Sequence, residues 1–366
     1  MKKALIVLLL LAFVAGGLFA QFSFSGRIDG GLGIFQRSGD DEDFTMGMIS
    51  KQLDGGGVRA EVNMNVTNEA GNAGLSFRLR ANGSPAGTAF RDALQWRWAY
   101  AWVKGLDGVI EAQGGRIQGT DYDTLDDLSD GDTLYDAHGL LFYIRPVDVF
   151  SFGVGANAGA TLGSASAAKD VVTGWFGFGV NMDAFTLVAQ MSFARDDVNA
   201  YVSASVDAID NVDIIVTAGL WNLSDFSDFG SLFFYEQFGF SGVENLGLNL
   251  GLVQGIAQAA DDIYFRGVLW VTYAIGNIIP RLDINFVMGG CYDVGSFYFT
   301  GDSFAPTFNK DMLYVSFTPQ VKLQAAKNCF VDVGFFGGID LGDVPAFGGN
   351  KTGFNYGAFC DIMVRM

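Results

Sequence analysis

Alternation of apolar and polar residues over Val58 to Thr67 is the feature that most constrains this chain. The segment reads V-R-A-E-V-N-M-N-V-T, and successive side chains of an extended strand point to opposite faces. The valines therefore share one face, while Arg59, Glu61 and the asparagines share the other. The same alternation recurs along nearly the whole chain, for example at 22–34 and 281–288. This pattern predicts a sheet with one apolar and one polar face.

The first twenty residues have the organisation of a secretory signal peptide. Lys2 and Lys3 precede an uncharged apolar run from Ala4 to Val14, and small residues follow up to Ala20. This run is shorter than the ~20 residues that a membrane-spanning helix needs. We expect residues 1–20 to be removed and residues 21–366 to form a single domain.

The composition of the remaining chain favours a barrel wall in lipid. Half of all residues are hydrophobic, with 34 Phe and 50 Gly, and only 17% are charged. Alternating strands give a high apolar content without any run of about 18 apolar residues. A β-barrel whose outer face contacts lipid is the fold that best accounts for this combination. The net charge of −18 becomes −20 without Lys2 and Lys3, which argues against a nucleic-acid partner.

Short and long connections take turns between the expected strands. The short turns lie at 68–72, 105–108, 145–148, near Asp183, and at 207–212, 242–246, 276–280 and 325–328. The longer loops lie at about 36–56, 82–95, 118–137, 161–170, 195–199, 222–231, 256–262, 291–310 and 340–351. With Phe44 to Leu53 assigned to the first loop, these connections separate 18 strands, and 16 is the main alternative. The fold class is all-β, a transmembrane antiparallel up-and-down barrel.

The chain ends on an amphipathic strand from Thr352 to Met366. With the alternation and the signal peptide, this strand resembles the closing strand of bacterial outer-membrane β-barrel proteins of the porin type, particularly Gly-, Phe- and Asp-rich spirochaete examples. The resemblance implies the outer membrane as location, its lipid as surroundings, and the barrel-assembly machinery as a partner. Such strands usually end in an aromatic residue, whereas this one ends in Met366.

The polar faces of the first strands carry arginines, and the loop after the fifth strand is acidic. The resemblance implies that this third loop folds into the lumen and faces a basic wall, so that opposite charges form a constriction. Its candidate residues are Arg27, Arg59, Arg78, Arg80 and Arg97 on the wall, and Asp121, Asp123, Asp126, Asp127, Asp130 and Asp132 in the loop.

Two other readings of these charges remain. The aspartates could form a solvated surface loop while the arginines pair locally, for instance Arg27 with Asp29 and Arg59 with Glu61. Calcium is a weaker alternative, because an EF-hand alignment on Gly131 puts Leu128 at a ligand position, so the motif fails. We expect no metal and no cofactor.

Aromatic residues near strand ends are candidates for the girdles that mark the two membrane interfaces. They are Phe22, Phe24, Trp96, Trp98, Trp102, Trp175, Trp221 and Trp270. Trp96, Trp98 and Trp102 share an apolar face opposite Arg97, which favours a girdle over a sugar-stacking track inside the lumen.

Cysteine and histidine give little support to catalysis. Cys291, Cys329 and Cys360 match no metal or redox spacing, although a bridge between Cys329 and Cys360 is conceivable. His138, the one histidine, lies beside Asp136 at a loop end and is read as a rim residue. We therefore expect no enzyme activity.

The sequence favours an outer-membrane pore for passive diffusion of small hydrophilic solutes or ions. The acidic net charge predicts a mild cation preference that the arginines can reverse locally, and association into homotrimers is left open. The alternative is a surface-exposed structural barrel or adhesin with a filled lumen, which acts through the loops at 118–137 and 291–310. A channel for hydrophobic molecules ranks last, because no hatch segment precedes Phe22.

Overall fold

The computed structural model describes most of the mature chain. Described residues are 20–36, 45–49, 58–83, 94–125, 134–158, 172–194, 197–225, 228–257, 262–291, 307–343 and 352–366. The predicted signal peptide lies almost entirely outside them and stays a prediction. No helix in these ranges is long and apolar enough to cross a membrane.

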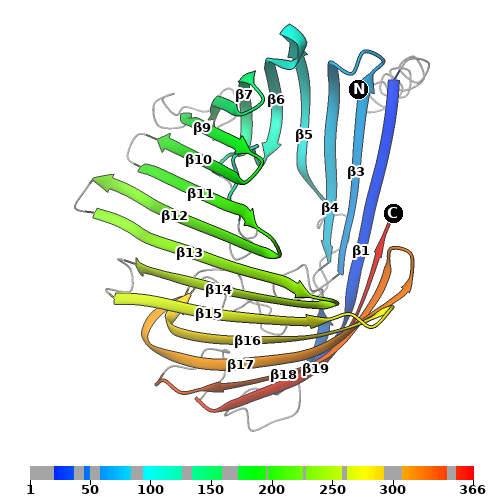
Figure 1. The fold of residues 1–366 in the computed structure, drawn as a ribbon, viewed down its shortest axis with the longest axis vertical. Coiled ribbons are helices and arrows are strands. Elements are labelled where there is room, and N and C mark those ends of the chain that lie inside the picture. The colour runs from blue at the N-terminus through cyan, green and yellow to red at the C-terminus, as the bar shows by residue number, and fades with distance from the viewer. Residues whose placement is uncertain are drawn as a thin grey trace.

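Long strands make up almost all of the described structure (Figure 1). They are β1 (Ala20–Gln36), β2 (Thr45–Ile49), β3 (Val58–Asn68), β4 (Ala73–Gly83), β5 (Leu94–Gly105), β6 (Ile110–Gln118), β7 (Asp136–Val147), β8 (Phe150–Ala158), β9 (Val172–Met182), β10 (Phe185–Ala194), β11 (Asp197–Ile209), β12 (Val212–Asp225), β13 (Asp228–Val243), β14 (Leu246–Ala257), β15 (Asp262–Tyr273), β16 (Ile278–Cys291), β17 (Thr307–Ala326), β18 (Cys329–Asp340) and β19 (Phe354–Arg365). One 3-10 turn, η1 (Leu106–Gly108), joins β5 to β6.

Antiparallel pairing of β1 with β19 closes the sheet into a barrel. The short strand β2 pairs with the last part of β1, while β3 pairs with the first part, so β2 and β3 share one position in the wall. The barrel therefore has 18 strand positions, as the sequence predicts, and the segment containing β2 adds no position.

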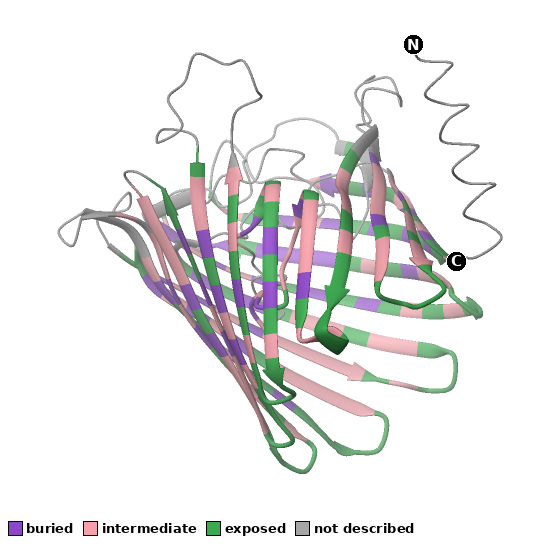
Figure 2. Cartoon of the chain, turned by 90° about the horizontal axis from the view of Figure 1, so that it is seen from above, coloured by how far each residue is buried: buried purple, intermediate pink, exposed green. Residues whose placement is uncertain are grey.

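Short turns define one rim of the barrel, and the strand ends that the longer connections join lie at the other (Figure 2). At the short-turn rim, Asn211, Asn245 and Asn328 adopt positive φ angles of 63°, 64° and 61° in the tight turns after β11, β13 and β17. Asparagine tolerates this left-handed conformation better than most residues. The turn residues thus fix the register of these hairpins, and the short turns fall where the sequence predicts them. The predicted longer loops at 195–199 and 222–231 are wrong in their bounds, because β11 already begins at Asp197, β12 continues to Asp225 and β13 begins at Asp228.

The two faces of the wall differ in polarity and in packing. Gln190, Ser203, Thr217 and Asn285 are buried on the inner face, whereas outer side chains such as Phe24 are exposed. Burial therefore alternates along most strands (Figure 2). Because a closed sheet crowds its concave side, the inner face buries polar groups against each other, and the outer face needs an apolar medium.

Inner-face aromatic residues form a row around part of the barrel. Phe233, Tyr235, Tyr264, Tyr314 and Phe336 are all buried and belong to one cluster across β13, β15, β17 and β18. Phe35 on β1 extends this row, with its ring centroid 5.6 Å from that of Phe336. The inner wall is therefore lined by aromatic as well as polar side chains.

The girdle assignment is wrong for five of the eight aromatic residues. Five tryptophans lie on the inner face instead. Trp98 is opposite Arg78 and Trp102 is opposite Gly74, while Trp175 belongs to a buried inner cluster. Trp221 packs against Tyr201, and Trp270 is opposite Asp283. Phe22, Phe24 and Trp96 lie on the outer face, and their place in a girdle stays a prediction.

A β-bulge at Arg97 explains part of this error. Trp96 pairs with Leu79 and Trp98 with Arg78, so Arg97 is an extra residue between them. A bulge shifts the alternation by one residue and moves all later side chains to the other face. Trp98 and Trp102 therefore turn inward. The girdle prediction for Trp175, Trp221 and Trp270 rested on their position near strand ends. That position does not determine whether a side chain lies on the inner or the outer face.

Cys329 and Cys360 form no bridge. Both cysteines are free, with Cys329 opposite Val364 and Cys360 opposite Val333 in the β18–β19 ladder. Cys360 is exposed on the outer face. Both residues are therefore isolated small side chains, as their spacing in the sequence favours.

The polarity of the two faces predicts the effect of a new charge. Leu250 lies on the outer face of β14 and is 40% exposed, whereas its neighbour Asn249 lies on the inner face. We expect Leu250→Arg to lower the free energy of unfolding in lipid vesicles by about 2–4 kcal/mol, because the charge enters hydrocarbon. Asn249→Arg is the matched control and should change it much less. Equal losses in a urea titration would contradict the assignment of faces.

Candidate functional site

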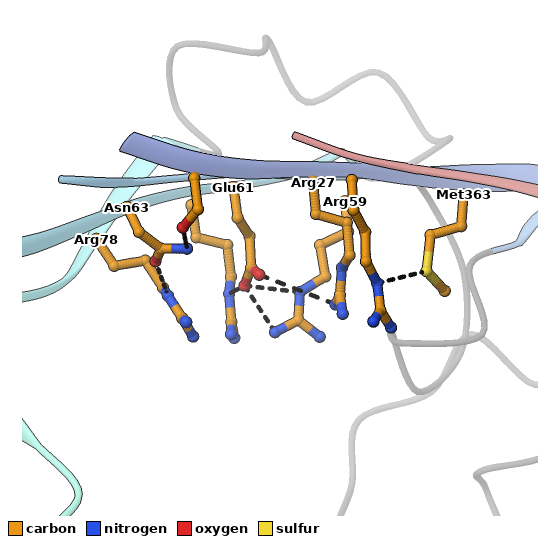
Figure 3. Close-up of polar contacts among 9 residues, drawn as sticks. Arg27, Arg59, Glu61, Asn63, Arg78 and Met363 are labelled. Carbon is orange, nitrogen blue, oxygen red and sulfur yellow. Dashed lines mark hydrogen bonds and ion pairs between the residues drawn. The ribbon is translucent and has the colours of Figure 1, made fainter. Parts of the chain in front are cut away.

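Strand register brings the predicted wall arginines together on the inner face of β1 and β3–β5. Arg27 is opposite Glu61, Glu61 is opposite Arg80, and Asn63 is opposite Arg78. The guanidinium groups lie side by side and point away from the wall into the barrel (Figure 3). Five arginines from four strands thus form one basic surface.

Glu61 is the acid at the centre of this surface. Its Oε1 accepts hydrogen bonds from Arg59 Nε at 2.9 Å and Nη2 at 2.8 Å, and also from Arg80 Nε. Arg27 Nη2 lies 3.9 Å from Oε2. Only 6% of the Glu61 side chain is exposed. Charge-assisted bonds to a buried carboxylate hold the guanidinium groups in fixed positions.

The remaining arginines extend the surface in both directions. Arg78 Nε donates a hydrogen bond to Asn63, and its guanidinium carbon lies 3.8 Å from the centre of the Trp98 ring. Arg97 interacts electrostatically with Arg78 and Arg80. Arg365, opposite Arg27, donates to the sulfur of Met363. We call Arg27, Arg59, Arg78, Arg80, Arg97 and Arg365 the arginine cluster.

Carboxylates occupy the inner wall on the other side of β1. Asp332 on β18 and Asp361 on β19 are buried cross-strand partners. Asp361 is also opposite Gly31, two residues along β1 from Asp29. Asp29 is fully buried, accepts no hydrogen bond from the described residues and interacts electrostatically with Arg27. The inner wall therefore changes from acidic to basic across β1.

Both described ends of the third loop, between β6 and β7, contact the inner wall of the barrel. The backbone N–H of Leu125 donates to Ser203 Oγ on β11 at 3.1 Å, and that of Leu134 donates to Gln190 Oε1 on β10 at 3.2 Å. Ser203 and Gln190 are buried on the inner face. Both described ends of the loop, 119–125 and 134–135, therefore lie against the inner wall.

Tyr122 anchors the first end of this loop on glycines. Its ring packs against Trp175 with centroids 5.8 Å apart, over the inner face of β8 and β9. A Cβ at Gly177 would lie 2.2 Å from the ring, and one at Gly153 would lie 2.8 Å from it. Only glycine leaves room for the tyrosine at these positions. Tyr122 is itself 2% exposed.

Tyr135 anchors the second end. Its hydroxyl donates to the carbonyl oxygens of Ala156 at 2.9 Å and Leu140 at 3.2 Å, and its ring lies edge-on to Trp175 with centroids 5.9 Å apart. The two ends of the loop therefore meet on the same tryptophan.

The acids of the loop do not reach the arginine cluster where the structure describes them. Asp121 pairs with Arg145 on β7, which also lies 3.2 Å from Glu111. Asp123 accepts from the backbone and hydroxyl of Thr120 in a local turn. Asp126, Asp127, Asp130 and Asp132 lie outside the described residues.

A cavity of about 320 Å³ opens beside the Asp121–Arg145 pair. Ser151, Asn181 and Thr186 contribute polar side chains to its lining near the short-turn rim. The described part of the loop therefore leaves a space between itself and the wall that both polar and apolar side chains line.

The structure brings together only some of the residues of the predicted constriction. The arginines gather on one wall, and the two described ends of the loop lie inside the barrel. Arg59 also pairs locally with Glu61, as the alternative reading has it. Sequence reasoning missed Arg145 and Glu111 as partners, and Tyr122 as an anchor. The inward glycines of β8 and β9 were the available signal, since they alternate with apolar residues such as Phe176 and Phe178.

His138 and Asp136 lie away from this lumen site. They belong to the outer face of β7 at the long-loop rim, where Asp136 pairs with Arg116 at 2.6 Å. Across the residues that the structure describes, no group of three or more His, Cys, Asp or Glu could hold a metal ion.

Solved bacterial structures share this barrel fold. OccK11 (OpdR) of Pseudomonas aeruginosa aligns with a TM-score of 0.54 and 9% identity, over 94% of this chain and 96% of its own. OccAB3 of Acinetobacter baumannii gives 0.53 and 8%, and a triple mutant of the Rhodopseudomonas blastica porin gives 0.52 and 11%, each over 94% of this chain and 100% of its own. No protein-family model and no curated protein matches the sequence. At these identities the likeness establishes a porin-like fold.

The anchoring of the third loop predicts the effect of removing its ring. Tyr122→Ala deletes contacts whose loss in a protein core costs about 3–5 kcal/mol, so we expect the loop end to detach. The conductance of single barrels in a planar bilayer should then rise. Tyr273→Ala, at the exposed short-turn rim, is the control and should conduct like the original chain. Equal conductance in all three proteins would show that Tyr122 holds no part of the barrier.

Alkaline pH should release the same loop at its other end. Burial raises the pKa of Tyr135 to about 12, above the ordinary value of 10.0. The neutral phenol is thus favoured in the folded barrel, and its stabilisation is present below pH 10 and lost as pH rises through 12. We expect conductance to increase over this interval in the original chain and less in Tyr135→Phe. Superimposable pH profiles would contradict the role of this hydroxyl.

Proposed function

We propose that this protein is an outer-membrane channel for passive diffusion of small hydrophilic solutes or ions. The arginine cluster carries the proposal. Charged side chains in a barrel wall are stable where water reaches them, and the outer face of the same strands is apolar. A wall with this polarity suits a water-filled lumen surrounded by lipid.

The charges of the inner wall suggest how solutes are sorted. Ions in a narrow lumen respond to charges within about 8–10 Å, because salt screens more distant ones. The arginine cluster therefore outweighs remote acidic loops at its own level, while Asp29, Asp332 and Asp361 supply the opposite sign across β1. This boundary would orient dipolar solutes, in addition to selecting ions by charge.

Other features extend the proposal to the cell. The Gly-, Phe- and Asp-rich composition supports a spirochaete-type barrel, and the terminal strand β19 would be the segment that the assembly machinery reads. Lipid would be the partner of the outer face. OccK11, OccAB3 and the Rhodopseudomonas porin support the fold from which this function is argued.

Conductance of the refolded mature protein in a planar bilayer tests the proposal. Stable single-channel steps are expected. A heat-modifiable barrel that inserts into lipid without conducting would exclude the pore and favour the surface-exposed structural barrel or adhesin.

Substitutions in the arginine cluster should move ion selectivity in opposite directions. Arg78→Ser with Arg80→Ser removes two positive charges and should shift the reversal potential in a salt gradient toward cations. Glu61→Gln removes the central carboxylate and should shift it toward anions. Arg281→Ser, on β16 and paired with Asp283, is the matched control for loss of a lumen arginine. Unchanged reversal potentials in both cluster variants would remove the arginine cluster from the mechanism.

A further inference from the structure

One hydrogen-bonded pair interrupts the apolar outer face. Glu236 on β13 lies between Tyr235 and Gln237, which are both buried on the inner face, so its own side chain points outward. Its partners in the ladder are Val216 on β12 and Leu252 on β14. Val216 is 43% exposed, which confirms the outward direction at this level.

Gln254 on β14 lies on the same outer face. It alternates with the buried Val253 and Gly255, and its ladder partners are Phe234 and Phe265. Its Nε2 donates to Glu236 Oε1 at 3.3 Å. We call Glu236 and Gln254 the outer polar pair. Away from the two rims, no other carboxylate or amide lies on the outer face among the side chains that the structure describes.

Apolar residues continue on both sides of the outer polar pair. Phe234 and Phe238 flank Glu236 along β13, at 40% and 39% exposure, and Ile256 lies beyond Gln254 at 44%. The pair therefore sits inside the apolar band, where its bond leaves one carboxylate oxygen and one amide N–H for other partners. An ionisable group facing hydrocarbon is costly, and such groups usually face protein or water.

A small recess adjoins the outer polar pair. Gly267 on β15 lies opposite Leu252 on one side and Phe286 on the other. The nearest described atoms to a Cβ placed there belong to Phe265 at 3.5 Å and Leu252 at 3.8 Å, which are ordinary van der Waals distances, so the outer surface is recessed at this glycine. Small residues on a lipid-facing surface allow close approach of a neighbouring chain.

We propose that the outer face of β13–β15 around the outer polar pair packs against a second copy of this chain through a two-fold axis along the membrane normal. Two copies in one membrane lie at the same depth, so each presents the same pair at the same height. The free amide N–H of one Gln254 can then donate to the free carboxylate oxygen of the other copy's Glu236. This self-complementarity favours a second copy over a different partner, and a pair over a ring of three.

Cysteine cross-linking in vesicles tests this contact, which rests on the membrane insertion of the proposed function. In a background with Cys291, Cys329 and Cys360 changed to Ala, Leu252→Cys places a thiol beside the two-fold axis. Ile362→Cys, on the outer face of β19 and 49% exposed, is the matched control. Oxidation in phosphatidylcholine vesicles should link most Leu252→Cys chains into pairs and leave Ile362→Cys unlinked. Equal yields, or no linked pairs, would overturn the proposal.

The oligomeric mass in detergent gives a second, independent readout. Native mass should correspond to two copies for the original chain and for Glu236→Gln, which keeps the hydrogen bonds. Glu236→Leu with Gln254→Leu should give one copy, with heat-modifiable migration confirming a folded barrel. A double variant that stays paired, or an original chain of one or three copies, would overturn the two-fold contact.

Conductance of the same vesicle samples separates the two proposals. Channels without cross-links would leave the pore and remove the interface, whereas cross-linked pairs without conductance would leave the interface and remove the pore.

Discussion

Hydrogen bonding between the first and last strands is the interaction on which the rest of this structure depends. Ten residue pairs join β1 to β19, from Arg27 opposite Arg365 to Gln36 opposite Tyr356. Closure removes both sheet edges, which an apolar medium would leave with unpaired backbone groups. It also divides every strand into a concave inner face and a convex outer face. The apolar exterior, the crowded polar interior and the inward position of the described ends of the third loop all require this closed wall.

Closure also explains how the arginine cluster is held. Residues 27, 59, 78, 80 and 97 come from four strands that the ladder places side by side, and the register sets Glu61 between Arg27 and Arg80. One buried carboxylate then organises several guanidinium groups that would otherwise repel each other. Because β1 joins the two ends of the chain, it also brings Asp332 and Asp361 next to this basic surface.

Local sequence predicted the parts of the fold that depend on neighbouring residues. Alternation at Val58–Thr67 assigned inner and outer faces correctly, and the tight turns ending at Asn211 and Asn245 lie where polar turn residues predict them. The sequence identified the wall arginines because each one stands at a polar position of the alternation and leaves the apolar face continuous. Trp98 and Trp102 were misplaced because the bulge at Arg97 is an event in the pairing of two strands. Nothing in the sequence of β5 alone requires it.

By itself, the sequence determined the fold class and the alternation of polar and apolar side chains along most strands, because these follow from a period of two and from turn chemistry. Only the tertiary structure decided between 18 and 16 strand positions, because the count depends on how β2 and β3 pair with β1. Only the tertiary structure decided that Asp121 meets Arg145 rather than the arginine cluster. It also decided that Tyr122 rests on the glycines of β8 and β9, and that Glu236 meets Gln254 on the outer face. These contacts join side chains from different strands or from a loop and the wall, so their formation depends on register and closure, which no single segment encodes.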